Sequence, residues 1–168
     1  MIHASMFGAA TAAGAYLAIP LPPVPITLQT FVLFMAGALL GGRLGALSQV
    51  VYILLGVMGL PVFAGGKGGL GVLFGPTGGY LLGFVAGAFV VGSLIGMKRQ
   101  PGLAWYFCSM AAGTLVIYLF GVIQLSLVAK LTLSQSAAVG LVPFIVGDVF
   151  KILAAGVLSI KIRDKIRR

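Results

Sequence analysis

Long runs of apolar residues, divided by short clusters of proline, glycine and basic residues, make up nearly all of the 168-residue chain. Only 8% of the residues are charged and 60% are hydrophobic, and the mean hydropathy is +1.17. Soluble globular domains carry roughly a quarter charged residues. A soluble fold of this size cannot cover so much apolar surface. The sequence therefore predicts an integral membrane protein.

The lengths of the apolar runs predict six membrane-spanning helices, because a spanning helix needs about 20 apolar residues. Proline and glycine clusters separate the runs and mark where helices end. The expected fold is an all-α membrane protein with a single transmembrane domain, residues 1–168. The expected spans are residues 2–19, 28–40, 44–60, 80–97, 103–128 and 137–160, followed by a basic tail at residues 161–168.

The net charge of +9 indicates membrane orientation rather than nucleic-acid binding, because the basic residues lie at the ends of the apolar runs. With cytoplasmic termini, only Lys67 and Lys130 fall on the outer side. The positive-inside rule favours this choice over its inverse. The inner side then holds Arg43, Lys98, Arg99, Lys161, Arg163, Lys165, Arg167 and Arg168.

Two irregular loops, Pro20–Thr27 and Pro61–Gly79, fall on the same outer side of this topology. The first is rich in proline and the second in glycine, and both are apolar. Irregular apolar backbone at a membrane surface is tolerated where it packs on protein or lines a cavity. We expect the two loops to form a lid. The alternative is that they are tight connectors, but loops as long as the second are usually functional or disordered.

Asp148 and Lys151 are the charged residues that fall well inside a predicted span, close to Pro143 and Gly147. A charge at the bilayer centre costs about 2.5–3.5 kcal/mol on insertion scales. Three positions apart on a helix, the two side chains share a face. The functional interpretation is a polar ligand site in an apolar cavity. A self-neutralising salt bridge and a proton relay are the alternatives.

Further ligand candidates lie at the ends of the two loops. Gln29, with Thr27 and Thr30, follows the proline loop, and Thr77 and Tyr80 flank a glycine pair. Thr27 is also placed to cap a helix, and Tyr80 to anchor the chain at the membrane interface. In the second loop, Phe63 and Phe74 can cover an apolar ligand or fill the packing of the loop itself. Lys67 can steer anions inward or be a solvated charge.

Catalytic and metal chemistry find no support in the sequence. The chain has one histidine, His3, one cysteine, Cys108, and two acids, so no metal site or catalytic triad can be assembled. The stretch Gly66–Gly71 fits a dinucleotide-binding pattern by letter only, without the strand and helix that such a motif needs. No ATP-binding loop is present. We expect neither enzymatic activity nor a cofactor.

Small residues recur every four positions in the first span. One row contains Ala4, Gly8 and Ala12, and a second contains Ser5, Ala9 and Ala13. Such rows let a second helix approach closely. Most small-residue rows in a chain with 26 glycines serve internal packing. The first span is nevertheless a candidate docking face for a partner subunit, through Gly8 and Ala12 or through Ala9 and Ala13.

Several of these segments resemble the signatures of one family. The stretch Ile19–Thr30, read as Ile-Pro-Leu-Pro-Pro-Val-Pro-Ile-Thr-Leu-Gln-Thr, is similar to the first loop of the BioY family. The stretches Gly59–Gly66 and Gly75–Tyr80 resemble its third loop, and Gly147-Asp148 with Lys151 resembles its last-helix motif. The family consists of the biotin-specific S components, or substrate-binding subunits, of energy-coupling factor (ECF) transporters.

This resemblance implies a six-helix S-component bundle with the first and third loops as its lid. It implies high-affinity biotin binding and import across the prokaryotic cytoplasmic membrane, with Asp148 and Lys151, and then Gln29, Thr77 and Tyr80, as polar contacts. It also implies docking of the first span, through an Ala-x-x-x-Ala face, to a transmembrane coupling protein that works with ATPase subunits.

Two other functions stay open from the residues alone. One is a self-sufficient carrier of biotin or another small carboxylate, coupled to ions through Asp148; the lack of another carboxylate within the spans weakens it. The other is a purely structural membrane subunit. The sequence leaves open whether the ATPases are dedicated or shared, and which small-residue row docks the partner.

Overall fold

Helices account for most of the computed structural model, which describes residues 1–167. Arg168, the last residue of the expected basic tail, lies outside the described residues. The elements in chain order are α1 (Ile2–Tyr16), β1 (Ala18–Ile19), β2 (Ile26–Thr27), α2 (Gln29–Leu40), α3 (Gly42–Val57), the 3-10 helix η1 (Leu70–Val72), α4 (Gly78–Gly96), α5 (Leu103–Ala129), α6 (Leu133–Gly140), the 3-10 helix η2 (Val142–Phe144) and α7 (Ile145–Arg167).

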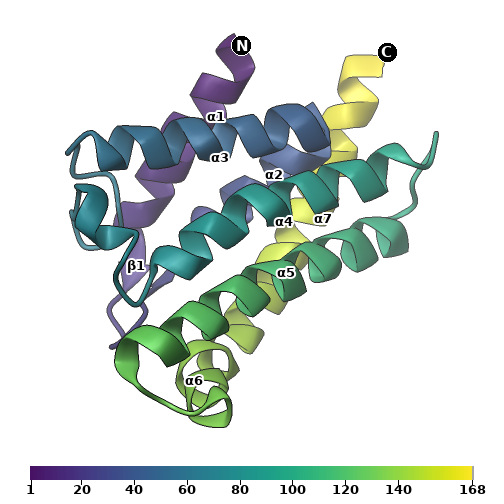
Figure 1. The fold of residues 1–168 in the computed structure, drawn as a ribbon. Helices are drawn as coiled ribbons and strands as arrows, with labels where there is room; N and C mark the ends of the chain where they lie inside the picture. The colour runs from purple at the N-terminus through teal and green to yellow at the C-terminus, as the bar shows by residue number, and fades with distance from the viewer. Residues whose placement is uncertain (168) are drawn as a thin grey trace.

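The helices form one bundle with both termini at the same end (Figure 1). An even number of crossings requires this arrangement, so it agrees with the expected six spans. Among the described residues, three segments are long and apolar enough to cross a membrane: α4, α5 and the stretch Leu133–Lys165. The helices α2 and α3 are apolar but shorter. The chain is thus a membrane protein.

Local sequence explains where most helices end. Gly41, with φ 83°, separates α2 from α3, and Lys130, with φ 54°, ends α5. Glycine adopts positive φ without steric cost. Among the described residues, Lys130 is the only residue other than glycine with a positive φ. Pro101 and Gly102 precede α5, where proline excludes a continuous helix.

The expected sixth span, residues 137–160, is wrong as a continuous helix. The chain forms α6 from Leu133, interrupts it at η2 beside Pro143, and then continues as α7 to Arg167. Thr132 and Gln135 build a reciprocal capping box at the start of α6, so helical structure begins at Leu133, before the expected start of the span at residue 137. Proline cannot donate the backbone hydrogen bond that a continuous helix needs, and α7 runs on through the expected tail.

The first span also ends earlier than expected, at Tyr16 rather than near Ile19. Two short strands follow, and Ala18 pairs with Thr27 in an antiparallel hairpin. The proline-rich loop is therefore the tip of a hairpin. Its strands are only two residues each, because the prolines between them have no N–H groups to donate.

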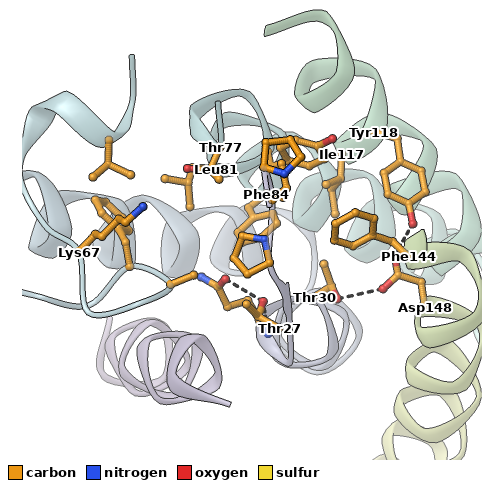
Figure 2. Close-up of a pocket in the computed structure, with 18 of the residues that line it drawn as sticks. Thr27, Thr30, Lys67, Thr77, Leu81, Phe84, Ile117, Tyr118, Phe144 and Asp148 are labelled. Carbon is orange, nitrogen blue, oxygen red and sulfur yellow. Dashed lines mark hydrogen bonds between the residues drawn. The ribbon is translucent and has the colours of Figure 1, made fainter. Parts of the chain in front are cut away.

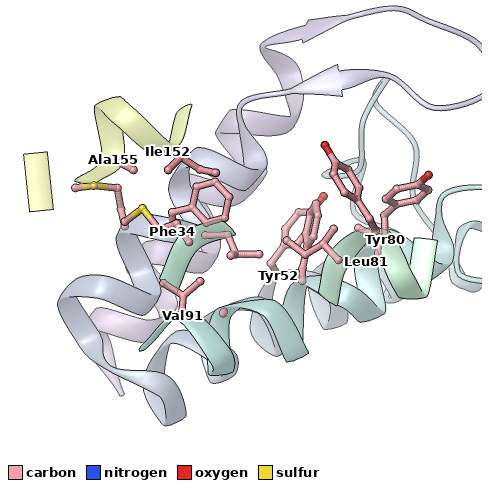
Figure 3. Close-up of a cluster of buried hydrophobic side chains, with 14 of the residues drawn as sticks. Phe34, Tyr52, Tyr80, Leu81, Val91, Ile152 and Ala155 are labelled. Atoms are coloured by element: carbon pink, nitrogen blue, oxygen red, sulfur yellow. The ribbon is translucent and has the colours of Figure 1, made fainter. Parts of the chain in front are cut away.

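The core is centred on α2, which packs against α4 and α7, with α3 and α5 flanking α4 (Figure 3). Phe34 and Val91 are fully buried there beside Ile152 and Ala155. The interface between α4 and α5 is the most extensive in the bundle. Gly79, Gly83 and Gly87 form its close-contact surface: a Cβ at Gly79 would lie 2.3 Å from the Phe120 oxygen. This glycine row serves internal packing, as expected for most of them.

Candidate functional site: a pocket beneath the outer loops

A pocket lies among the hairpin tip, the loop before α4, and the facing sides of α2, α4, α5 and α7 (Figure 2). Its volume is about 100 Å³, several times what a single water molecule requires. The walls are mostly apolar and aromatic, with polar groups in small clusters. The lining residues are Pro23, Val24, Pro25, Thr27, Gln29, Thr30, Phe63, Ala64, Lys67, Val72, Thr77, Tyr80, Leu81, Phe84, Ile117, Tyr118, Phe144, Asp148 and Lys151.

Asp148 and Lys151 both line this pocket and form an ion pair with each other. The Lys151 Nζ lies 2.9 Å from the Asp148 Oδ1, and the two residues are only 8% and 4% exposed. The salt bridge that the sequence offered as an alternative therefore exists, but it faces a cavity rather than a sealed core. Neutralisation within the pair lowers the cost of placing both charges inside the bundle.

Neighbouring hydroxyls complete this buried cluster. Tyr118 donates to the Asp148 Oδ2 at 2.5 Å. Lys151 donates to the Thr30 hydroxyl at 3.1 Å, and Thr30 donates to the Asp148 Oδ1 at 3.4 Å. A carboxylate has about four acceptor positions and an ammonium has three donors. Three of the carboxylate's acceptor positions and two of the ammonium's donors are occupied. One acceptor position on the Asp148 Oδ2 and one donor on Lys151 are left.

Gln29 organises a second polar cluster at the start of α2. Its side-chain nitrogen donates to the Tyr52 hydroxyl, and its side-chain oxygen accepts from Thr27 at 2.8 Å. The Tyr52 hydroxyl in turn donates to the Val62 oxygen at 3.2 Å. Leu28 is the N-cap residue of α2, but the Thr27 hydroxyl accepts from the Gln29 backbone N–H at 3.3 Å. The cluster connects the hairpin to the loop that follows α3.

Phe63 and Phe74, the two loop aromatics, have different environments. Phe63 is 2% exposed, lines the pocket, and packs edge-on against Tyr52 at 5.6 Å between ring centroids. The Phe63 ring lies against Gly56, and a Cβ added to Gly56 would lie 2.1 Å from this ring. Phe74 is 74% exposed and absent from the lining. Phe74 therefore does not cover the pocket in this structure.

Tyr80 and Thr77 both line the pocket, from the start of α4. The Tyr80 hydroxyl donates to the Gly140 oxygen at 2.7 Å. That carbonyl lies at the end of α6, where it lacks a partner within the helix. Tyr80 thus fixes the interrupted last span against α4. Thr77 is the N-cap residue of α4 and forms no side-chain capping bond.

The loop between α3 and α4 is tied down near both ends. The Tyr16 hydroxyl donates to the Pro61 oxygen. The Gln124 side chain donates to the oxygens of Leu73 and Gly75 at 2.6 and 2.8 Å. Between these ties, Gly65, Gly66 and Gly69 have positive φ, a backbone form that glycine tolerates best. The loop is anchored to α1 and α5 while its centre approaches the pocket.

Several lining residues carry no signal in the sequence. Tyr118, Ile117, Phe84 and Phe144 lie within long apolar runs, where an aromatic or branched residue is indistinguishable from core. Tyr118 becomes recognisable only because α5 packs beside α7 and brings its hydroxyl to Asp148. Gln124, by contrast, is an amide within an apolar span, which is a signal that the sequence does offer.

The structure separates the two small-residue rows of α1. Ala4, Gly8 and Ala12 are buried, and a Cβ at Gly8 would lie 3.0 Å from the Ser48 oxygen on α3. Gly8 and Ala12 are therefore internal packing residues, and their candidacy as partner contacts is wrong. Ala9 and Ala13 are exposed and remain candidates for docking.

Comparisons with known proteins agree with this architecture. Residues 1–168 match the BioY family. A biotin transporter BioY from Thermotoga maritima is 44% identical over 97% of this chain and 95% of its own. A probable biotin transporter BioY from Lysinibacillus sphaericus is 39% identical over 95% of this chain and 84% of its own.

One solved structure has the same fold. It is the S-component for biotin from an ECF-type ABC transporter, with a TM-score of 0.88, 29% sequence identity, and coverage of 97% of this chain and 89% of that chain. The expected S-component bundle is thereby confirmed. The family match extends over the entire sequence. On these grounds, the chain belongs to the BioY family.

Proposed function

We propose that this chain binds biotin and imports it across the cytoplasmic membrane as the substrate-binding subunit of an ECF-type ABC transporter. Relatives named biotin transporters cover nearly the whole chain, and the S-component for biotin shares its fold. The observation that carries the proposal is the polar cluster of Asp148, Lys151, Thr30 and Tyr118 inside an otherwise apolar pocket.

The free positions of this cluster fit one part of biotin. The ureido group of biotin carries N–H donors beside a carbonyl acceptor. Asp148 retains an acceptor position on Oδ2 and Lys151 retains one N–H donor, so the pair matches the donors and the acceptor of a cyclic urea. Hydrogen bonds to charged groups contribute about 1.5–3 kcal/mol each. The aromatic walls then cover the apolar ring edge and chain of the ligand.

Other lining residues have supporting roles in this proposal. Gln29 has one N–H and one acceptor position left for a ligand after its bonds to Tyr52 and Thr27. Thr77, Tyr80 and Phe63 supply contact surface at the start of α4 and beneath the long loop. The hairpin tip and the long loop act as the lid that retains the ligand.

The orientation follows from the distribution of charge. The hairpin and the pocket face outward, and both termini face the cytoplasm, because this choice places Arg43, Lys98 and Arg99 with the basic end of α7 on the inner side. Biotin then enters from the outside of a prokaryotic cell. Residues 1–168 act as a single transmembrane substrate-binding domain.

The direct test is calorimetric titration of the purified chain with biotin. We expect one tight site per chain for biotin and none for thiamine, a vitamin without a ureido group or carboxylate. Liposomes that contain the chain alone distinguish the ion-coupled alternative: accumulation driven by a pH gradient alone would contradict dependence on ATPase partners. Absence of biotin binding would refute the proposal itself.

The exposed face of α1 is the proposed contact with the transmembrane coupling protein, which in turn contacts the ATPase subunits. Ala9 and Ala13 lie on this face without a partner helix among the described residues, and small side chains allow a second helix to approach closely.

Ala13→Trp therefore tests the docking face. We expect the variant to bind biotin normally but to lose co-purification with the coupling protein and ATPases. Leu115→Trp on α5 is the matched control, since Leu115 is 67% exposed and far from α1 in sequence; it should assemble normally. Intact assembly of Ala13→Trp would place the contact elsewhere.

A further inference from the structure

Polar groups lie on two sides of the pocket, and only one of the two sides carries a positive charge without a nearby carboxylate. Figure 2 shows Lys67 on one side and Asp148 on the other, with Thr27 between them. On the Asp148 side, the positive charge of Lys151 is balanced by the carboxylate 2.9 Å away. Lys67 belongs to the lining as well, but no acidic group of the described residues pairs with it. The uncompensated positive charge of the pocket is thus on the Lys67 side.

Backbone contacts hold Lys67 at this position. The Phe63 N–H donates to the Lys67 oxygen at 2.9 Å, which closes a small antiparallel bridge. Phe63 is buried above Gly56 and against Tyr52. The turn between the two bridged residues uses Gly65 and Gly66, with φ of 75° and 68°. The loop therefore presents Lys67 to the pocket through an anchored turn.

The surroundings of the two lysines decide which is the better partner for an anionic ligand. Lys151 is 8% exposed and already paired, so a ligand carboxylate there would be buried beside the like charge of Asp148. Lys67 is exposed, so a carboxylate that meets it keeps part of its hydration. Burial of an ion is costly unless it is fully compensated, and this difference favours Lys67.

We infer that Lys67 recognises the ionised carboxylate of the bound ligand and makes the pocket selective for the free acid over its neutral esters and amides. This inference rests on the proposed function, since biotin carries its carboxylate at the end of the chain opposite the ureido group. With the ureido group at Asp148, an extended ligand directs its carboxylate toward Lys67.

A comparison of biotin with biotin methyl ester isolates the carboxylate charge. The dissociation constants of both ligands are measured by calorimetry for the wild type and for Lys67→Gln. We expect the wild type to prefer the free acid, and Lys67→Gln to reduce that preference about fivefold to tenfold, the range between an exposed ion pair and a charged hydrogen bond. The loss should fall on biotin, with the ester unaffected. Added salt should weaken the preference in the wild type only.

Two further variants serve as controls. Lys67→Arg keeps the charge and should keep the preference. Lys130→Gln removes the exposed lysine at the end of α5, which is not part of the lining, and should change neither ligand. An unchanged preference in Lys67→Gln, or an equal loss for both ligands, would overturn the inference. A wild type that binds neither ligand would refute the proposed function instead.

Discussion

Asp148→Ala is expected to abolish measurable biotin binding and to destabilise the protein. The substitution removes the acceptor proposed for the ureido group, and it leaves Lys151 buried without its partner. Loss of one member of a buried pair costs about 3–5 kcal/mol. Binding should weaken at least about 100-fold, because hydrogen bonds to charged groups are worth about 1.5–3 kcal/mol each. Calorimetry with biotin and thermal unfolding in detergent measure the two effects.

A double variant separates the structural role of the pair from its role in binding. Asp148→Asn combined with Lys151→Met removes both charges while it preserves volume. Tyr118 can still donate to the asparagine oxygen, and the asparagine amide can donate to the Thr30 hydroxyl, because the two hydroxyls contact different Asp148 oxygens. Replacement of a buried ion pair by neutral residues is often neutral or stabilising. We expect wild-type stability without biotin binding. Wild-type affinity in the double variant would show that the pair is only a salt bridge and would remove Asp148 and Lys151 from the site.

Gly92→Ala is expected to cause a large loss of stability. A Cβ at this position would lie 2.3 Å from the Gly42 nitrogen, 2.4 Å from the Gly41 carbonyl carbon and 2.7 Å from the Gly37 oxygen. All three are backbone atoms, so no side chain can rotate away. The helices α2, α3 and α4 must separate, and overpacking of this kind costs about 3 kcal/mol. The thermal unfolding temperature measures the loss.

Gly96→Ala is the matched control, because Gly96 is one turn further along α4 and nothing lies within 4 Å of its would-be Cβ. Alanine is favoured over glycine in a helix by about 1 kcal/mol, so this variant should be as stable as the wild type or slightly more stable. Equal stability of Gly92→Ala and Gly96→Ala would show that the junction of α2, α3 and α4 is loosely packed.

The two glycine positions show how far a sequence can be interpreted. Both occur in the same apolar run with similar neighbours, and no local pattern distinguishes them. The difference arises because α2 and α3 cross α4 at Gly92 and not at Gly96. The same holds for the rows of α1, where only packing against α3 separates Gly8 and Ala12 from Ala9 and Ala13.

The last span gives a second contrast. Asp148 and Lys151 were recognisable because a charge within an apolar run is costly and rarely accidental. Their partner Tyr118 was not, since its hydroxyl gains a role only when α5 and α7 lie side by side. The interruption at η2 was only hinted at by Pro143. The exposed position of Phe74 was not predictable, because the direction of a loop depends on contacts such as those of Gln124 with the Leu73 and Gly75 carbonyls.

The sequence by itself determined the membrane environment, the approximate positions of the spans and the charged pair, because hydropathy, helix-breaking residues and the cost of a buried charge act locally along the chain. Only the tertiary structure decided which side chains share the pocket, which glycines are indispensable and which face of α1 is free. Those properties depend on contacts between segments distant in the chain, and no local pattern encodes how two helices approach each other.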